Sequence, residues 1–191
     1  MSGLFSPLQG GERAEDKSMN LPRVTEVLSP YIDFSMVRPD VLEVASDRGT
    51  RVHNYCAAYA KRIYVGPVDA DCNGYVESFL IWFNKYVATV LAVELELVSP
   101  FGYIGHVDLI VRLKDGRVAV IDLKTPLAGS KTWKAQIAAY KRAATEFHPD
   151  IAGTLQLHPE GKAPKMTWLE DEVMAFNAFL SALNAQRYFG K

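Results

Sequence analysis

Two apolar segments separated by a short polar turn constrain this chain more than any other feature of its sequence. Residues 105–113 and 117–124 are rich in β-branched side chains, and Lys114, Asp115 and Gly116 stand between them. An Asp-Gly pair flanked by such runs is a strong signal for a β-hairpin. We expect a three-residue loop in which Gly116 takes the left-handed conformation that suits glycine. The chain is therefore expected to build a sheet around this hairpin.

Three charged residues interrupt the apolar hairpin: Asp108 in the first strand, and Asp122 and Lys124 in the second. Residues two apart in a strand share a face, and a three-residue loop sets Asp108 directly across from Asp122. Two carboxylates and an ammonium group are then expected to converge. Adjacent carboxylates repel unless a cation lies between them, and hard oxygen ligands suit Mg²⁺ or Mn²⁺. A lysine beside them can stabilise the charge that develops during phosphodiester hydrolysis.

A purely structural explanation of these charges stays open. Asp122 and Lys124 can form a buried salt bridge, and charges can also protect the edge of a strand. Buried charge clusters are rare and costly, however, so the pattern favours a functional site by a small margin.

Other motifs accompany the hairpin in a fixed order. They are Gly49-Thr50-Arg51-Val52-His53, Gly105-His106-Val107-Asp108, Asp122-Leu123-Lys124 and Gln136-Ile137-Ala138-Ala139-Tyr140. Together they resemble the PD-(D/E)XK nuclease superfamily. The branch they resemble includes the nuclease domain of recombination helicase–nucleases, CRISPR-adaptation nucleases and phage-encoded exonucleases. The resemblance runs from Leu21 to the C-terminus, and the segment 21–28 is similar to the opening of phage members. The chain departs from the pattern at Val107, where the family has proline, and at Asp122, where glutamate is common.

The resemblance implies a chemical role for the charged motif residues. The implied catalytic residues are Asp108, Asp122 and Lys124. The implied ligands of Mg²⁺ or Mn²⁺ are His53, Asp108, Asp122 and the carbonyl of Leu123. A lone histidine on a helix is more often structural than a ligand, but its Gly-Thr context favours the ligand role.

The resemblance also implies contacts outside the metal site. Gln136 and Tyr140 lie four apart on a predicted helix, so they share a face and would touch the DNA backbone. Without the family, Tyr140 reads as a core residue. Glu94 or Glu96, on the preceding strand, would be an additional acid near the site, with Glu94 the better match. A solvent-facing strand edge explains either glutamate equally well.

The periodicity of apolar residues predicts the order of the elements. The predicted segments are a helix near 50–63, a helix over 75–91, strands over 93–98, 104–113 and 117–124, a helix over 133–147, strands over 151–158 and 165–169, and a helix over 171–185. The two hairpin strands are apolar on both faces, so helices should cover both sides of the sheet. The class is α/β, and the resemblance specifies a restriction-endonuclease-like α/β/α sandwich with a central mixed sheet. The last helix should bury Val173, Met174, Phe176, Phe179, Leu180 and Leu183.

Length and composition set further bounds. A chain of 191 residues with 49% hydrophobic residues fits one nuclease domain over 21–191, after a flexible arm over 1–20. The net charge of −1 does not indicate a nucleic-acid-binding protein, although a local basic patch can still form. Residues that would form it are Lys131, Lys134, Lys141 and Arg142, which a solvated helix face explains as well.

The cysteines and the apolar runs exclude several alternatives. Cys56 and Cys72 cannot supply the four thiolates of an iron–sulfur cluster, and free thiols indicate a reducing compartment. No signal peptide and no run of about 18 apolar residues is found, so we expect a cytoplasmic protein with no membrane partner.

The sequence therefore predicts a divalent-metal-dependent nuclease that hydrolyses DNA. An exonuclease acting on single-stranded or double-stranded DNA ends, in phage recombination or DNA repair, is favoured by analogy with the branch. One alternative is a structure-specific endonuclease. The other is a non-catalytic nucleic-acid-binding module on the same fold. Protein partners are not predicted.

Overall fold

The computed structural model describes residues 21–126 and 128–190, so the arm predicted over 1–20 lies outside the described residues. Its centre is one mixed sheet in the order β1-β2-β3-β4-β5. The strands are β1 Val87–Ser99, β2 Tyr103–Leu113, β3 Val118–Lys124, β4 Ile151–Gln156 and β5 Lys165–Trp168. The β3–β4 pair is parallel and the other pairs are antiparallel. The predicted α/β class is confirmed.

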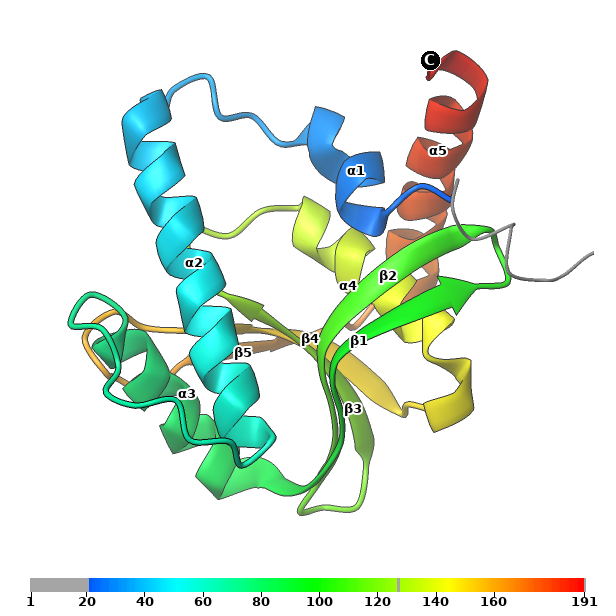
Figure 1. Ribbon diagram of the computed structural model, residues 1–191. Coiled ribbons are helices and arrows are strands. Elements are labelled where there is room, and N and C mark those ends of the chain that lie inside the picture. The colour runs from blue at the N-terminus through cyan, green and yellow to red at the C-terminus, as the bar shows by residue number, and fades with distance from the viewer. Residues whose placement is uncertain (1–20, 127, 191) are drawn as a thin grey trace, which may run out of the picture.

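Helices cover both faces of this sheet (Figure 1). They are α1 Val24–Leu28, α2 Pro39–Ala60, α3 Asn73–Tyr86, α4 Thr132–Ala143 and α5 Glu172–Phe189, with 3-10 turns at Ser29–Tyr31 and Thr145–Phe147. Alternate residues of β3 point to opposite faces. Val118 and Val120 belong to the apolar cluster under α1, α4 and α5, whereas Ala119 and Ile121 belong to the cluster under α2 and α3. Among the described helices, none is both long and apolar enough to cross a membrane.

The hairpin of β2 and β3 has the predicted register. Leu109 pairs with Ile121 and Arg112 with Val118, and the Leu113 N–H donates to the Arg117 carbonyl at 2.8 Å. The loop is thus Lys114–Gly116, with Gly116 at φ 93°. After β3 the chain crosses over through α4 to the parallel strand β4. The end of β3 therefore lies beside both β2 and the start of α4, which is where the candidate site forms.

Several predicted boundaries are wrong. α2 begins at Pro39, ten residues before Gly49, because Pro39 stands at the first helical position, where proline fits. α3 ends at Tyr86, and residues 87–91, for which the sequence predicts helix, belong to β1. Val87 and the residues after it gain backbone pairing with β2, which outweighs their helical pattern. α4 likewise ends at Ala143 and is followed by a 3-10 turn.

The inward face of α5 was also predicted with errors. Phe176, Phe179 and Leu183 are buried as expected, but Val173 and Met174 are 63% and 68% exposed. Asp171 caps the helix, because its side chain accepts a hydrogen bond from the Met174 N–H. This cap sets the start of the helix, and its first turn faces away from the sheet.

Candidate functional site

Three side chains from three different elements meet where α2 packs against strands β1 and β2. The ligand atoms of His53, Glu94 and Asp108, from α2, β1 and β2, all lie within 4.8 Å of one another. We refer to these three residues as the acid–histidine cluster. Glu94 faces Asp108 because its neighbour Val93 pairs with Leu109 in the antiparallel ladder. The predicted convergence of His53 with Asp108 is therefore observed.

Asp108 is held in the charged state by its neighbours. Its Oδ1 lies 3.2 Å from Nδ1 of His53, and its Oδ2 accepts a hydrogen bond from the Leu123 N–H at 2.6 Å. Burial raises the pKa of Asp108, but the His53 charge and these hydrogen bonds lower it further, to below its usual value. Burial alone would lower the pKa of His53. The negative charge of Asp108 more than offsets this effect, so the pKa of His53 lies above its usual value. The pair thus places the negative carboxylate of Asp108 beside the imidazole of His53, which can carry a positive charge.

Asp122 is more deeply buried than Asp108, and its surroundings only partly compensate its negative charge. Its side chain is buried, with Oδ2 at 2.7 Å from Lys124 Nζ. This ion pair is the contact that the structure gives to the buried Oδ2 atom. Burial raises the pKa of Asp122 to about 6, assisted by the charge of Asp108 and opposed by Lys124. The salt bridge considered from the sequence exists, but it leaves a carboxylate oxygen that another cation would stabilise.

Lys124 is oriented by a chain of hydrogen bonds from α4. Its Nζ donates to Gln136 Oε1 at 2.9 Å, and Gln136 Nε2 donates to the Tyr140 hydroxyl at 2.9 Å. Tyr140 is only 2% exposed, so its side chain occupies the core position that the sequence also allowed. Its ring packs on Gly105, where an added Cβ would lie 3.0 Å from Tyr140 Cδ1. The glycine of the Gly-x-x-Asp motif therefore makes room for Tyr140.

The two candidate glutamates separate clearly. Glu94 joins the acid–histidine cluster, and its Oε2 lies 2.6 Å from Nε2 of His106. Glu96 instead forms a half-exposed salt bridge with Arg23, at 3.0 Å, and is not part of the acid–histidine cluster. Glu94 has φ 51°, a left-handed backbone that strand residues rarely adopt. Such strain is often found at functional sites, where surrounding contacts maintain it.

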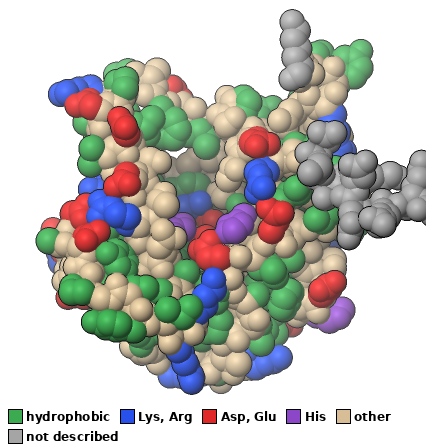
Figure 2. All heavy atoms as spheres, viewed as in Figure 1, with side chains coloured by type: hydrophobic (Ala, Val, Ile, Leu, Met, Phe, Trp, Pro, Cys, Tyr) green, Lys and Arg blue, Asp and Glu red, His purple; other side chains and the backbone are tan. Residues whose placement is uncertain are grey.

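The acid–histidine cluster opens into a cavity of about 670 Å³, which we call the site cavity. In Figure 2 a hollow lies beside acidic and histidine side chains. The cavity is also lined by His106, Phe34 and Arg48, which sequence reasoning did not identify. His106 stands inside the Gly-x-x-Asp motif, which offered a signal. Phe34 and Arg48 depend on how the first half of α2 packs, and no motif marks them.

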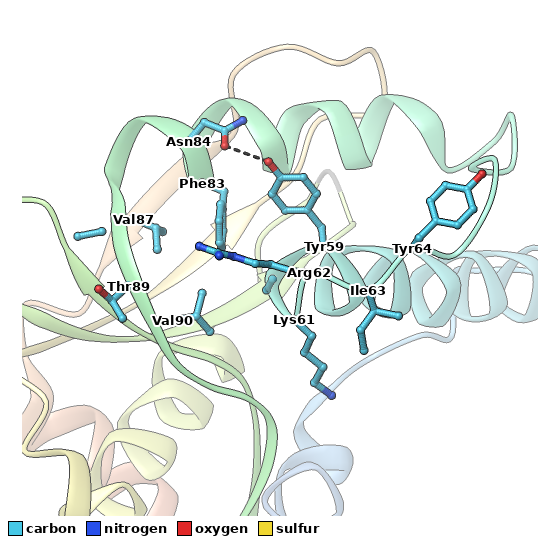
Figure 3. A pocket seen from close by; sticks show the side chains of 12 residues that line it. Tyr59, Lys61, Arg62, Ile63, Tyr64, Phe83, Asn84, Val87, Thr89 and Val90 are labelled. Atoms are coloured by element: carbon cyan, nitrogen blue, oxygen red, sulfur yellow. Dashed lines mark hydrogen bonds between the residues drawn. The ribbon is translucent and has the colours of Figure 1, made fainter.

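The larger cavity of about 750 Å³ lies elsewhere, at the carboxyl end of α2 (Figure 3). Tyr59, Arg62, Phe83 and Val90 line it, and the Tyr59 hydroxyl donates to Asn84 at 3.1 Å. None of its described lining residues is an aspartate, glutamate, histidine or cysteine. This cavity therefore lacks the ligands that a metal site needs, despite its size.

A second acidic group, formed by Asp69, Asp71 and Cys72, is already neutralised. Arg51 lies 2.8 Å from both Asp69 and Asp71 and 2.9 Å from Asp47. The hydrogen bond from Arg51 lowers the pKa of Asp71 to about 2. These carboxylates thus stabilise the loop before α3 against α2.

The basic patch expected around α4 is reduced. Lys141 and Arg142 each lie 2.7 Å from a carboxylate oxygen of Glu172, so they join α4 to α5. Lys131 and Lys134 are exposed. Two of the four basic residues considered from the sequence therefore form ion pairs within the fold, and the other two are exposed at the start of α4.

Comparison with known proteins adds no family assignment. No protein-family model matches the chain. No curated protein sequence matches it.

Proposed function

We propose that this chain is a divalent-metal-dependent nuclease of the PD-(D/E)XK superfamily, with a restriction-endonuclease-like α/β/α sandwich, that hydrolyses DNA phosphodiester bonds. One observation carries the proposal. The acid–histidine cluster lines the site cavity, and the Leu123 N–H donates to Asp108 Oδ2 at 2.6 Å, so Asp122 and Lys124 of the same hairpin lie directly beside the cluster.

The donor set fits a hard divalent cation. Two clustered carboxylates and an imidazole lie within 4.8 Å, and the neighbouring Asp122 carboxylate is buried with its pKa raised to about 6. The proposed ligands are His53, Glu94, Asp108, Asp122 and the Leu123 carbonyl. Oxygen-dominated sets of this kind suit Mg²⁺ and Mn²⁺. When bound, such a cation lowers the pKa of a water molecule and polarises a phosphodiester.

The protein's own contribution is a fixed positive charge beside these ligands. Lys124 Nζ is held between Asp122 Oδ2 at 2.7 Å and Gln136 Oε1 at 2.9 Å. It also lies 5.7 Å from the centre of the Trp133 ring. A preorganised ammonium group stabilises the negative charge that develops on a phosphate during hydrolysis. Gln136 and Tyr140 act as positioning residues, because they fix Lys124.

The proposed mode is an exonuclease in phage recombination or DNA repair, and this mode rests on the resemblance alone. The test is incubation of the protein with linear and circular DNA, single-stranded and double-stranded, in Mg²⁺, Mn²⁺ or chelator. We expect linear DNA to be shortened from its ends with either metal and all DNA to survive in chelator. Cleavage of circular DNA would instead identify an endonuclease. Tight binding with no cleavage of any substrate in Mn²⁺ would identify a binding module.

A further inference from the structure

The site cavity has one apolar wall that the metal chemistry does not use. Residues 32–38 form a bridging segment between α1 and α2 (Figure 1), and Phe34 of this segment lines the cavity together with Leu42. Phe34 is 49% exposed as a whole residue, and its ring makes no ring-to-ring contact with the described residues. A flat apolar face left open beside charged ligands is suited to stacking on a planar group.

Arg48 provides a second unused group at the same cavity. Its Nε is buried without a hydrogen-bond partner, and its guanidinium lies 5.5 Å from the centre of the Tyr75 ring. Within the described chain it forms no salt bridge, whereas Arg51, one turn later on α2, pairs with three aspartates. A guanidinium group that is not neutralised by a carboxylate is suited to bind phosphate.

We propose that the site takes an unpaired DNA strand, with Phe34 stacked on the base of a nucleotide next to the cleaved phosphodiester and Arg48 bound to a neighbouring phosphate. This inference rests on the proposed nuclease function. A base inside a duplex has both faces covered by its neighbours, so only an unpaired or unstacked base can offer a face to Phe34. Stacking of bases on aromatic side chains is the usual way in which proteins hold single strands.

Equilibrium binding in Ca²⁺ tests the stacking separately from cleavage. The probes are a fluorescent single-stranded oligonucleotide, its duplex, and a series of the single strand with one abasic position moved along it. We expect the single strand to bind at least tenfold more tightly than the duplex. One abasic position should weaken binding about tenfold, and its effect should vanish in Phe34→Ala.

Matched variants distinguish stacking on the flat ring of Phe34 from contact with any apolar side chain at this position. Phe34→Leu keeps an apolar side chain without a flat face, so it should behave like Phe34→Ala, whereas Phe34→Trp should retain the abasic effect. Tyr64→Ala removes an aromatic side chain that is 90% exposed at the other cavity and should bind as the wild type does. Arg48→Met should reduce the slope of the logarithm of the binding constant against the logarithm of the salt concentration by about 1, and Arg48→Lys should reduce it by less.

The outcomes separate the two claims. The same abasic profile in wild type and Phe34→Ala, or tighter binding of the duplex, overturns the stacking proposal whether or not the protein cleaves DNA. Absence of cleavage in Mn²⁺ with a Phe34-dependent profile intact counts against the nuclease function alone. Cooperative thermal unfolding of each variant confirms that it is folded, and failure of the wild type to bind any probe overturns the proposal.

Discussion

At the scale of single residues, Asp122 governs the electrostatics of the site. Its pKa of about 6 in the fold exceeds the value of about 3.9 expected for an unfolded chain, so its ionised form opposes folding when no metal is bound. The raised pKa of His53 acts in the same sense, since its stabilising charge is present below about pH 6.5 and is lost as the pH rises through the folded value. Asp108 has a lowered pKa, so its contribution changes only in more acidic solution.

A stability measurement in chelator checks this balance. We expect the metal-free wild type to have a higher Tm at pH 5.5 than at pH 7.5, and Asp122→Asn to show a smaller difference. Saturating Mn²⁺ should raise the Tm of the wild type more at pH 7.5, because protons compete with the metal at low pH. Identical pH dependence of the two proteins in chelator would contradict the assignment of Asp122.

His53 provides a second prediction at this scale. Its side chain contacts Asp108 from a helix surface and does not fill the core, so His53→Ala should fold normally. We expect it to bind Mn²⁺ about 10–100-fold more weakly, as measured by calorimetry, and to lose cleavage in proportion. Val52→Ala, at the adjacent buried position, serves as a control that affects stability but not metal affinity. Unchanged Mn²⁺ affinity in His53→Ala would remove His53 from the ligand set.

At the scale of elements, close approaches at two glycines bring the helices to the site. An added Cβ at Gly105 would lie 3.0 Å from the Tyr140 ring, and one at Gly49 would lie 3.3 Å from Thr125 Oγ1. The first contact sets α4 on β2, and the second sets α2 on the loop after β3. The backbone of Glu94, whose carboxylate meets the site, has φ 51° within β1. The site is therefore assembled by packing between elements and not by any one of them.

Gly105→Ala tests this packing. We expect the Tyr140 ring to shift, which disturbs the hydrogen bonds through Gln136 to Lys124 and costs about 1–3 kcal/mol of stability. Cleavage should fall even where the variant is still folded. Gly116→Ala, whose added Cβ meets nothing within 4 Å but whose φ is 93°, should destabilise the hairpin without a specific loss of rate. A Gly105→Ala protein with wild-type stability would contradict the role of this contact. Chemical denaturation and initial rates measure both effects.

At the scale of the whole molecule, the sequence predicted features set by neighbouring residues, such as the hairpin. It did not predict features set by packing between distant segments. The hairpin register followed from Gly116 and the apolar runs, because turn geometry fixes the pairing of adjacent strands. The change from helix to strand after Tyr86 depends on pairing with β2, and no local sequence pattern predicts this pairing. Phe34 and Arg48 reach the site only through the extension of α2 to Pro39.

The site itself was only partly predictable for the same reason. Asp108, Asp122 and Lys124 follow from strand periodicity, whereas His53 was assigned through the resemblance and is joined by contacts across three elements. Tyr140, to which the resemblance assigns a DNA contact, is buried, and its hydroxyl accepts a hydrogen bond from Gln136 inside the fold.

The most direct test of the central claim compares the wild type with Asp122→Asn on linear DNA in Mn²⁺. The substitution removes an anionic ligand while nearly preserving shape, so the variant should unfold at or above the wild-type Tm in chelator. We predict that the wild type cleaves, that chelator abolishes cleavage, and that Asp122→Asn is slower by about 10²–10³-fold. Equal rates for the two proteins in Mn²⁺ would show that cleavage does not arise at this site.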